Sequence, residues 1–324
     1  MLALLVAACV LPWSMDAPSA YMALGLLCCA MPAFGAGLYH DWRDTLTPRW
    51  RLVATALAAT AAFFALDIAV RATDIPGLDW VTGFAAGSLA VTVLAVAGIA
   101  NAINIIDGLN GLASMCVMIM LGAVGYVAFE VGDVLVLTLA TAGVGAVLGF
   151  FIWNFPAGLI FLGDGGAYFL GFYLSEVAIL LLVRNPTVSP LFPLLVCVYP
   201  IMETIFSIYR RYWLRSSLPS VPDGIHLHSL LYRRLMRWAV GSRSARAMNR
   251  RNSMTSPYLW LLCSMSIVPA VLFWDESAVI AVSLVLFAVA YITLYWRIVR
   301  FKSPGWLRPI ARLRRASRRD NRGS

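Results

Sequence analysis

Residues 82–103 read TGFAAGSLAVTVLAVAGIANAI, a run that contains no charged side chain. An α-helix needs about 20 such residues to cross the roughly 30 Å hydrocarbon core of a bilayer. The same character extends through the chain, because 61% of its 324 residues are hydrophobic and only 13% are charged. This composition excludes a disordered or ordinary soluble protein, and it predicts a chain that crosses the bilayer many times.

Similar apolar runs predict an all-α, polytopic membrane protein with about ten transmembrane helices. The expected spans cover residues 2–13, 19–38, 51–70, 82–103, 111–129, 134–153, 165–183, 190–209, 257–274 and 278–296. The first run is short, but it lacks the Lys or Arg residues that precede the apolar part of a signal peptide, so we expect a membrane segment. Residues 1–296 are predicted to form one membrane domain, and residues 297–324 a basic cytoplasmic tail.

The basic residues are unevenly distributed between the two sides of this domain. The chain carries 25 Lys and Arg against 16 Asp and Glu, a formal net charge of +9. With a cytoplasmic N-terminus, all of these cations except Arg71 and Arg184 fall on one side. That side comprises residues 39–51, 104–110, 154–164, 210–256 and 297–324. Cytoplasmic loops of membrane proteins are rich in Lys and Arg, so we expect these segments in the cytoplasm and expect no nucleic-acid partner.

A polar stripe ends the span quoted above. Asn101, Asn104 and Asp107 follow one another at intervals of three residues, so they share one helical face where the apolar run reaches the cytoplasmic side. Asn110 follows in a glycine-containing turn. A polar helix end with an asparagine cap is the plain structural alternative. Polar side chains at membrane depth are costly, however, and they favour a functional site.

A glycine-rich stretch begins the span at residues 165–183. Asn154 and Phe161 precede Asp164, which has Gly163 on one side and two glycines on the other. Glycine allows a ligand to approach the backbone closely, and the first amides of a helix favour anions. A helix cap explains Asp164 alone, whereas the glycines on both sides favour a site for metal-bound phosphate.

Two further polar stretches lie in the predicted cytoplasmic loops. Asp41 and Asp44 are almost one helical turn apart, with arginines nearby that suit phosphate or headgroup contacts. His226 and His228, followed by Arg233, form an H-x-H pattern without the further Cys or His that a zinc site needs. We expect these imidazole and guanidinium groups to bind phosphate. A basic loop held at anionic lipid headgroups is the alternative.

The carboxylates of these separate loops repel one another unless a cation joins them. No lysine is available near Asp41, Asp107 or Asp164, because Lys302 is the only lysine in the chain. A divalent ion is the economical solution. Oxygen ligands and phosphate chemistry favour Mg²⁺, with Mn²⁺ as a substitute, over zinc.

In this order, the motifs N-x-x-N-x-x-D-G, G-D-x-G and H-x-H resemble the polyprenyl-phosphate N-acetylhexosaminyl-1-phosphate transferase superfamily, from about Gly37 to Arg234. The resemblance implies an enzyme of the bacterial inner membrane with its active site facing the cytoplasm. Such an enzyme moves a sugar-1-phosphate from a UDP-sugar, here a UDP-N-acetylhexosamine, onto undecaprenyl phosphate. The products are UMP and a lipid diphosphate sugar that initiates a cell-envelope glycan. A homodimer is left open.

The resemblance also implies roles for the carboxylates. Asp164 matches the Mg²⁺-binding aspartate, and Asp107 matches a catalytic or metal-proximal aspartate. Asp41 matches the second of two paired aspartates and is the expected base, which takes a proton from the lipid phosphate in a direct displacement. A two-step route through a covalent aspartyl intermediate ranks second.

The expected substrate contacts come from all four motifs. Asn104, Asn154 and Phe161 match residues that line the nucleotide site of the family. His226 and His228 match a histidine motif that holds phosphate. The remaining expected contacts are Asp44, Asn101, Asn110 and Arg233.

Several positions depart from the family pattern. His40 stands where the first of the paired aspartates is common, Asn110 where an aspartate is frequent, and Ser229 where a third histidine is frequent. We also expect the family's first span, and the basic, glycine-rich loop after it, to be missing here. These departures leave an inactive family member as one alternative.

A membrane transporter or lipid flippase is the alternative from a different class. Glu176 and Glu203 lie within predicted spans, as the carboxylates of transport pathways do. The other unusual polar residues gather at one interface, whereas a transporter is expected to hold them near the midplane of the membrane. Their position suits chemistry between a cytoplasmic solute and a lipid headgroup.

Overall fold

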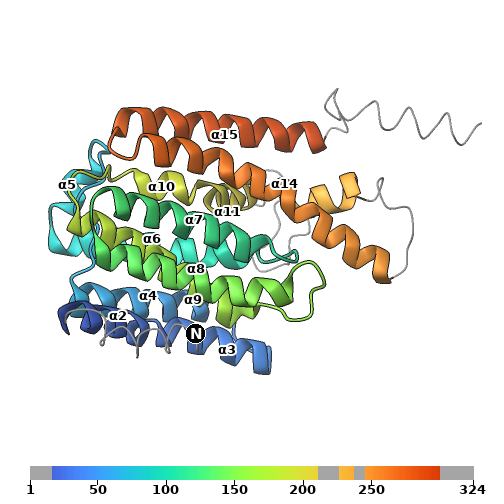
Figure 1. Ribbon diagram of the computed structural model, residues 1–324, viewed down its shortest axis with the longest axis horizontal. Helices are drawn as coiled ribbons and strands as arrows, with labels where there is room; N and C mark the ends of the chain where they lie inside the picture. Colours follow the sequence, from blue (N-terminus) through green and yellow to red (C-terminus); the bar gives the residue numbers. More distant parts are fainter. Residues whose placement is uncertain (1–16, 211–225, 237–244, 300–324) are drawn as a thin grey trace, which may run out of the picture.

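The computed structural model describes residues 17–210, 226–236 and 245–299. Within these residues the chain forms helices joined by loops and no strand, which confirms the all-α prediction. Figure 1 shows the long helices running side by side in one bundle. The predicted span at residues 2–13 lies outside the described residues, as does almost all of the predicted tail at 297–324.

The described helices follow the predicted spans closely. They are α2 (Ala17–Cys29), α3 (Met31–Arg43), α4 (Pro48–Leu66), α5 (Leu78–Thr82), α6 (Ala85–Ile106), α7 (Leu112–Glu130), α8 (Val134–Asn154), α9 (Gly163–Arg184), α10 (Phe192–Val196), α11 (Val198–Arg210), α12 (Leu227–Leu230), the π-helix η3 (Leu231–Met236), α14 (Ala245–Leu272) and α15 (Ser277–Val299). Eight segments of the described chain are long and apolar enough to cross a membrane. These are α2 with α3, then α4, α6, α7, α8, α9, the part of α14 from Asn252 onward, and α15.

The predicted span at residues 190–209 differs from the structure. Two shorter helices, α10 and α11, occupy this region and are separated at Cys197. Pro200, in the first turn of α11, has no N–H to donate to the carbonyl of Val196, so a continuous helix would lose a hydrogen bond there. The apolar composition predicted the burial of this region but not the break.

The most enclosed helix of the bundle is α9. In its apolar stretch 83% of the residues are buried, compared with 17% in the peripheral α15. It contacts α3, α6 and α7, among others. Gly171 packs directly against the backbone of α6, because a Cβ at this glycine would lie 2.4 Å from Cα of Ala100. Small residues of this kind let membrane helices approach closely.

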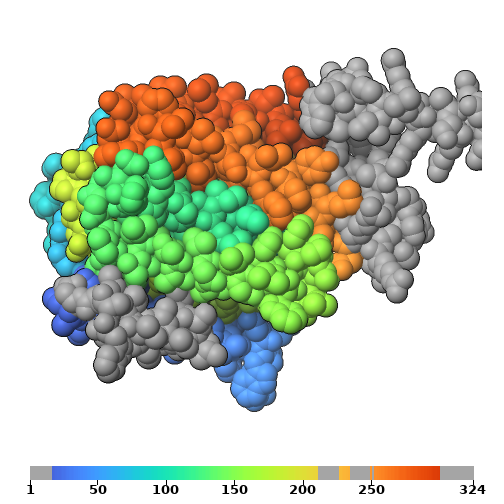
Figure 2. All heavy atoms as spheres, viewed as in Figure 1, coloured from blue at the N-terminus to red at the C-terminus, as the bar shows by residue number. Residues whose placement is uncertain are grey.

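The ends of several helices meet on one side of the bundle. The C-terminal ends of α3 and α6 lie near the N-terminal end of α9, because Asp41 and Asn104 both form hydrogen bonds with Asp164. Figure 2 shows the end of α3 and the start of α4 projecting from the bundle on this side, and α14 with α15 covering another flank. The fold thus brings segments that are far apart in sequence to one end.

We expect Gly171→Ala to lower the unfolding temperature of the detergent-solubilised protein. The added methyl group forces α6 and α9 apart, and overpacking of this kind costs about 1–3 kcal/mol. Gly122→Ala is the matched control, since a Cβ there has nothing within 4 Å and alanine favours a helix by about 1 kcal/mol. Equal effects of the two substitutions would contradict the close α6–α9 contact.

Candidate active site

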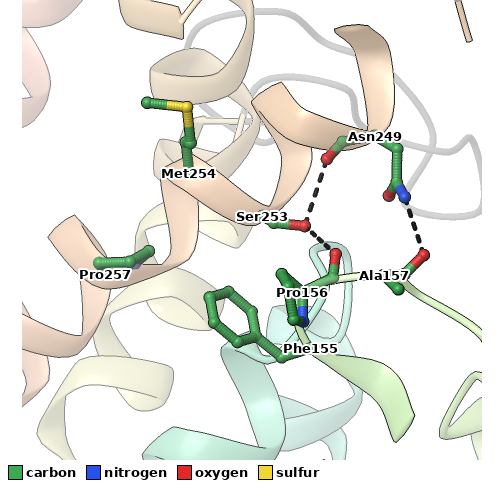
Figure 3. A pocket seen from close by; sticks show the side chains of 7 residues that line it. All are labelled: Phe155, Pro156, Ala157, Asn249, Ser253, Met254 and Pro257. Carbon is green, nitrogen blue, oxygen red and sulfur yellow. Dashed lines mark hydrogen bonds between the residues drawn. The ribbon is translucent and has the colours of Figure 1, made fainter. Parts of the chain in front are cut away.

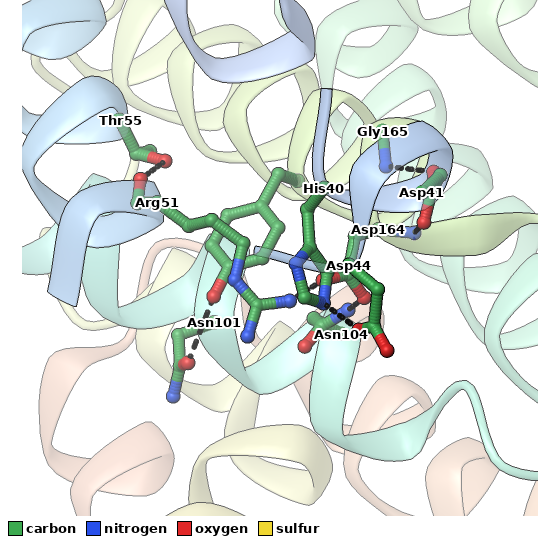
Figure 4. Close-up of polar contacts among 10 residues, drawn as sticks. His40, Asp41, Asp44, Arg51, Thr55, Asn101, Asn104, Asp164 and Gly165 are labelled. Atoms are coloured by element: carbon green, nitrogen blue, oxygen red, sulfur yellow. Dashed lines mark hydrogen bonds and ion pairs between the residues drawn. The ribbon is translucent and has the colours of Figure 1, made fainter. Parts of the chain in front are cut away.

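The carboxylate of Asp41, near the end of α3, lies on the first turn of α9 (Figure 4). Its Oδ1 accepts a hydrogen bond from the backbone N–H of Asp164 and its Oδ2 one from that of Gly165, both at 2.9 Å. A helix N-terminus has unpaired N–H groups and a positive dipole end, which a carboxylate stabilises. Gly163 has φ of +67°, and a Cβ there would lie 2.6 Å from Asp41 Oδ2. The glycine is therefore needed for the carboxylate to reach the helix.

Asp164 is surrounded by groups from three other helices. The side-chain amide of Asn104, on α6, donates a hydrogen bond of 2.7 Å to its Oδ1. Its Oδ2 forms an ion pair with Arg51 of α4 and lies 3.6 Å from Nε2 of His40 on α3. The structure thus brings residues of α3, α4 and α6 together around Asp164.

Arg51 was missed as a partner of the carboxylates. Sequence reasoning assigned the arginines of this region to phosphate or headgroups, and it inferred a divalent ion because no lysine was near. The structure places the guanidinium on Asp164 and 5.6 Å from the centre of the Tyr168 ring, whose hydroxyl donates to Asn101. The signal was available: Arg51 shares a helical face with the buried residues Thr55 and Ala58.

Asp107 ends α6 beside Asp41 and His228. Burial raises the pKa of its carboxyl to about 7; the negative charge of Asp41 adds to this effect and His228 partly opposes it. A Cβ at Gly108 would lie 2.9 Å from Nε2 of His228, so the imidazole packs against the turn that follows Asp107. We call Asp41, Asp107 and Asp164 the carboxylate cluster.

The predicted phosphate-binding histidines lie at the start of α12. His226 is half-buried and His228 is buried, and their rings stack with centroids 5.2 Å apart. Glu203 of α11 lies within 4 Å of one ring nitrogen of each. Arg233, on η3, is exposed. The structure therefore brings His228 to the cluster, whereas it records no contact between Arg233 and the cluster.

Asn154 and Asn110 connect loops in the structure. Oδ1 of Asn154 accepts from the N–H of Gly111 at 2.6 Å, and its Nδ2 donates to the carbonyl of Ile160 at 2.7 Å. Asn110 is buried and donates to Oδ1 of Asn249 on α14 at 2.8 Å. Both amides are thus engaged in holding the loops, and their predicted contacts with a nucleotide stay predictions.

Two other expected site residues are solvent-exposed. The Phe161 residue is 79% exposed, in the loop between α8 and α9. The Asp44 side chain is 96% exposed, and its Oδ1 lies 3.6 Å from Nε2 of His40. Neither is packed into the carboxylate cluster, although His40 connects Asp44 to Asp164.

The surroundings of Asp164 fit a Mg²⁺ ion that is bound together with substrate phosphates. Its Oδ2 is buried and accepts no hydrogen bond, so its contacts are the ionic ones to Arg51 and His40. Among the described residues, no three His, Cys, Asp or Glu side chains are arranged to hold a metal by themselves. Mg²⁺ is usually bound by one or two carboxylates plus phosphates. Asp164 would hold the Mg²⁺ ion through Oδ2, after Arg51 has released this oxygen.

A pocket of about 410 Å³ opens between the loop after α8 and the first part of α14 (Figure 3). Its lining residues are Phe155, Pro156, Ala157, Asn249, Ser253, Met254 and Pro257. Asn249 already donates to the carbonyl of Ala157 at 2.8 Å, and Ser253 donates to that of Pro156. No expected site residue lines this pocket, and its polar side chains are engaged within its wall.

Part of the chain is similar to a known protein family. Residues 23–182 match the family described as Glycosyl transferase family 4. This range contains the whole carboxylate cluster and ends before the histidines of α12. The match confirms the resemblance that the sequence motifs indicated.

Three curated proteins are similar to shorter segments. A probable undecaprenyl-phosphate N-acetylglucosaminyl 1-phosphate transferase of Bacillus subtilis is 34% identical over 121 residues, 37% of this chain and 32% of that protein. An undecaprenyl-phosphate alpha-N-acetylglucosaminyl 1-phosphate transferase of Thermotoga maritima is 31% identical over 29% of this chain and 30% of its own. A phospho-N-acetylmuramoyl-pentapeptide-transferase of Streptococcus thermophilus is 33% identical over 45% and 43%, respectively. Each alignment covers less than half of the relative's length.

We expect Asp107→Asn to raise the unfolding temperature at pH 8 and to raise it much less at pH 5. The carboxyl has a pKa of about 7 in the folded protein and about 4 when unfolded. The folded state therefore binds this proton more tightly, and stability is lost as the pH rises from about 4 through 7. Asparagine does not ionise and removes this loss.

Thermal unfolding in detergent without divalent ions measures this effect. Asp67→Asn is the control, because Asp67 is an exposed carboxylate at the other end of the bundle. A gain at pH 5 as large as that at pH 8 would show that ionisation of Asp107 is not opposed by its surroundings.

Proposed function

Because residues 23–182 match glycosyl transferase family 4, we propose that this protein transfers a sugar-1-phosphate from a UDP-sugar to undecaprenyl phosphate. The proposed donor is a UDP-N-acetylhexosamine, and the products are UMP and a lipid diphosphate sugar that begins a cell-envelope glycan. Two of the similar proteins are named as undecaprenyl-phosphate sugar-1-phosphate transferases. Their names support the acceptor and the type of reaction.

The convergence of the carboxylate cluster at one end of the bundle carries this proposal. Asp41, Asp107 and Asp164 come from α3, α6 and α9, and they meet where these apolar helices end. We propose that a soluble nucleotide reaches this site from one side and a lipid phosphate from the other. An arginine and imidazole groups at the same place suit phosphate ligands.

We further propose that this end of the bundle faces the cytoplasm of a bacterium, in its inner membrane. Arg43, Arg49 and Arg51 lie at the connection of α3 with α4, next to the cluster, and Arg210 ends α11 on the same side. The excess of arginine at this end supports the orientation by the positive-inside rule.

In the proposed reaction, an oxygen of the lipid phosphate forms a bond to the β-phosphorus of the UDP-sugar. The bond from this phosphorus to the oxygen that bridges it to the α-phosphorus breaks, and UMP leaves. A bound Mg²⁺ supplies neutralisation of the charge on the diphosphate and on the departing UMP. Asp164 would hold this ion, and Arg51, displaced from the carboxylate, would be free to pair with a phosphate.

Asp107 is the better candidate for the proton acceptor than Asp41. Both carboxylate oxygens of Asp41 already accept hydrogen bonds from the first turn of α9, so its proposed role is to position Asp164. The pKa of Asp107 is raised to about 7. A base with a pKa near the working pH accepts a proton efficiently, here the one carried by the lipid phosphate.

The structure supplies no separate argument for a transporter. Glu203, one of the two carboxylates that favoured transport, lies beside the histidines of α12 and so belongs to the site. Glu176 is buried in α9, and neither of its oxygens has a hydrogen-bond partner. A measurement of transferase activity distinguishes the proposed enzyme from an inactive family member.

The proposal is tested by incubating the purified protein with undecaprenyl phosphate, Mg²⁺ and a panel of UDP-sugars. We expect UMP release with one or a few donors and a lipid product whose mass identifies the sugar. Asp164→Asn should lower the rate at least about 100-fold, as expected when a group that stabilises transition-state charge is removed. Asp67→Asn, at the opposite end of the bundle, should retain the full rate. Absence of UMP with every donor, or full activity of Asp164→Asn, would overturn the proposal.

A further inference from the structure

Glu203 is a buried carboxylate for which the proposed reaction has no direct use. It lies on α11 and is only 1% exposed. A carboxylate at this depth is destabilising unless hydrogen bonds or cations compensate the loss of water. The hydroxyl of Tyr199, one turn earlier on the same helix, lies 3.5 Å from its Oε1, a long contact. The main compensation therefore has to come from another segment.

That segment is the beginning of α12. Oε2 of Glu203 accepts a hydrogen bond from the backbone N–H of Leu227 at 3.2 Å, and Oε1 accepts one from that of His228 at 3.3 Å. The carboxylate thus caps the N-terminus of α12, in the same way as Asp41 caps that of α9. Because α11 and α12 are separated in sequence, this contact holds the H-x-H motif in its place.

The same carboxylate also faces both imidazole rings. Nδ1 of His226 lies 3.8 Å from Oε2, and Nδ1 of His228 lies 3.6 Å from Oε1. The two rings stack with an angle of 7° between their planes, so they are oriented alike. A carboxylate beside Nδ1 fixes the orientation of an imidazole and stabilises its charged form.

The opposite ring nitrogen of His228 points toward the carboxylate cluster. A Cβ at Gly108 would lie 2.9 Å from Nε2 of His228, so this nitrogen packs against the turn after Asp107. A series of contacts therefore leads from α11 to the site: Glu203 contacts His228, and His228 contacts the Asp107–Gly108 turn.

We infer that Glu203 is a positioning residue that holds His228, by its Nδ1 and its backbone N–H, so that Nε2 faces a substrate phosphate beside Asp107. This inference rests on the function proposed above. Glu203 itself touches no substrate and acts through His228. The loss of its charge should therefore have no effect once the imidazole is gone.

A double-mutant cycle of Glu203→Gln and His228→Gln tests this dependence. Glutamine keeps the size of the side chain and one acceptor oxygen, and it removes the charge. We expect Glu203→Gln to lower kcat about 10- to 100-fold, as the loss of an orienting partner does. KM for the UDP-sugar should change less than about threefold, because a misplaced group weakens binding of the transition state more than binding of the substrate. The double variant should be no slower than His228→Gln alone.

Glu176→Gln is the matched control. It replaces the carboxyl group of another buried glutamate, in α9, whose oxygens have no hydrogen-bond partner. It should leave kcat and KM unchanged. The positioning role would be overturned if the fold-losses in kcat of the two single variants multiplied in the double variant. It would also be overturned if Glu203→Gln raised KM and left kcat unchanged.

A second measurement separates this inference from the proposed function. The unfolding temperatures of the same four proteins give the coupling between Glu203 and His228 without any turnover. If the unsubstituted protein releases no UMP, the proposed function fails, and additive losses of stability would then overturn the Glu203–His228 contact as well. If Glu203→Gln does not fold, Glu203→Asp replaces it in both cycles, because its shorter side chain retains the charge but cannot reach Nδ1.

Discussion

The contact between the carboxylate of Asp41 and the first turn of α9 is the interaction on which the site depends. α9 is the most enclosed helix of the bundle, and its first amides would lack partners without a cap. Asp41 supplies two hydrogen bonds from α3. The approach requires glycine on both helices, since a Cβ at Gly37 would lie 2.5 Å from Cα of Gly165. This junction fixes where Asp164 points, and the α3–α4 connection then brings Arg51 to it.

The carboxylates of the site contact protein groups, and we propose that substrates replace some of these groups. Arg51 and His40 hold Asp164, whereas burial and a neighbouring carboxylate raise the pKa of Asp107. The two aspartates thus have different surroundings, and we propose that Asp164 binds a metal ion while Asp107 exchanges a proton. The histidine side is organised similarly, with Glu203 as the buried counter-charge. Asp41 and Glu203 each accept hydrogen bonds at a helix N-terminus, of α9 and of α12 respectively.

Much of this arrangement follows from the sequence, and the remainder depends on contacts between distant helices. Apolar runs predicted the spans, and the three-residue spacing of Asn104 and Asp107 predicted a shared face. Periodicity identifies which residues share a face, but it does not identify the helix that this face meets. The inward direction of Arg51 and the use of Asn154 to join two loops were therefore missed. The break near Pro200 was visible in the sequence as a proline within an apolar run.

Hydrogen exchange of the backbone amides at the start of α9 tests the central claim most directly. In the unsubstituted protein the N–H groups of Asp164 and Gly165 should exchange slowly, because Asp41 accepts both. Asp41→Ala should accelerate the exchange of this segment by at least about tenfold, the equivalent of one net hydrogen bond. The start of α7, which does not contact Asp41, should keep its rate. Unchanged exchange at Asp164 and Gly165 in a folded Asp41→Ala protein would contradict the account.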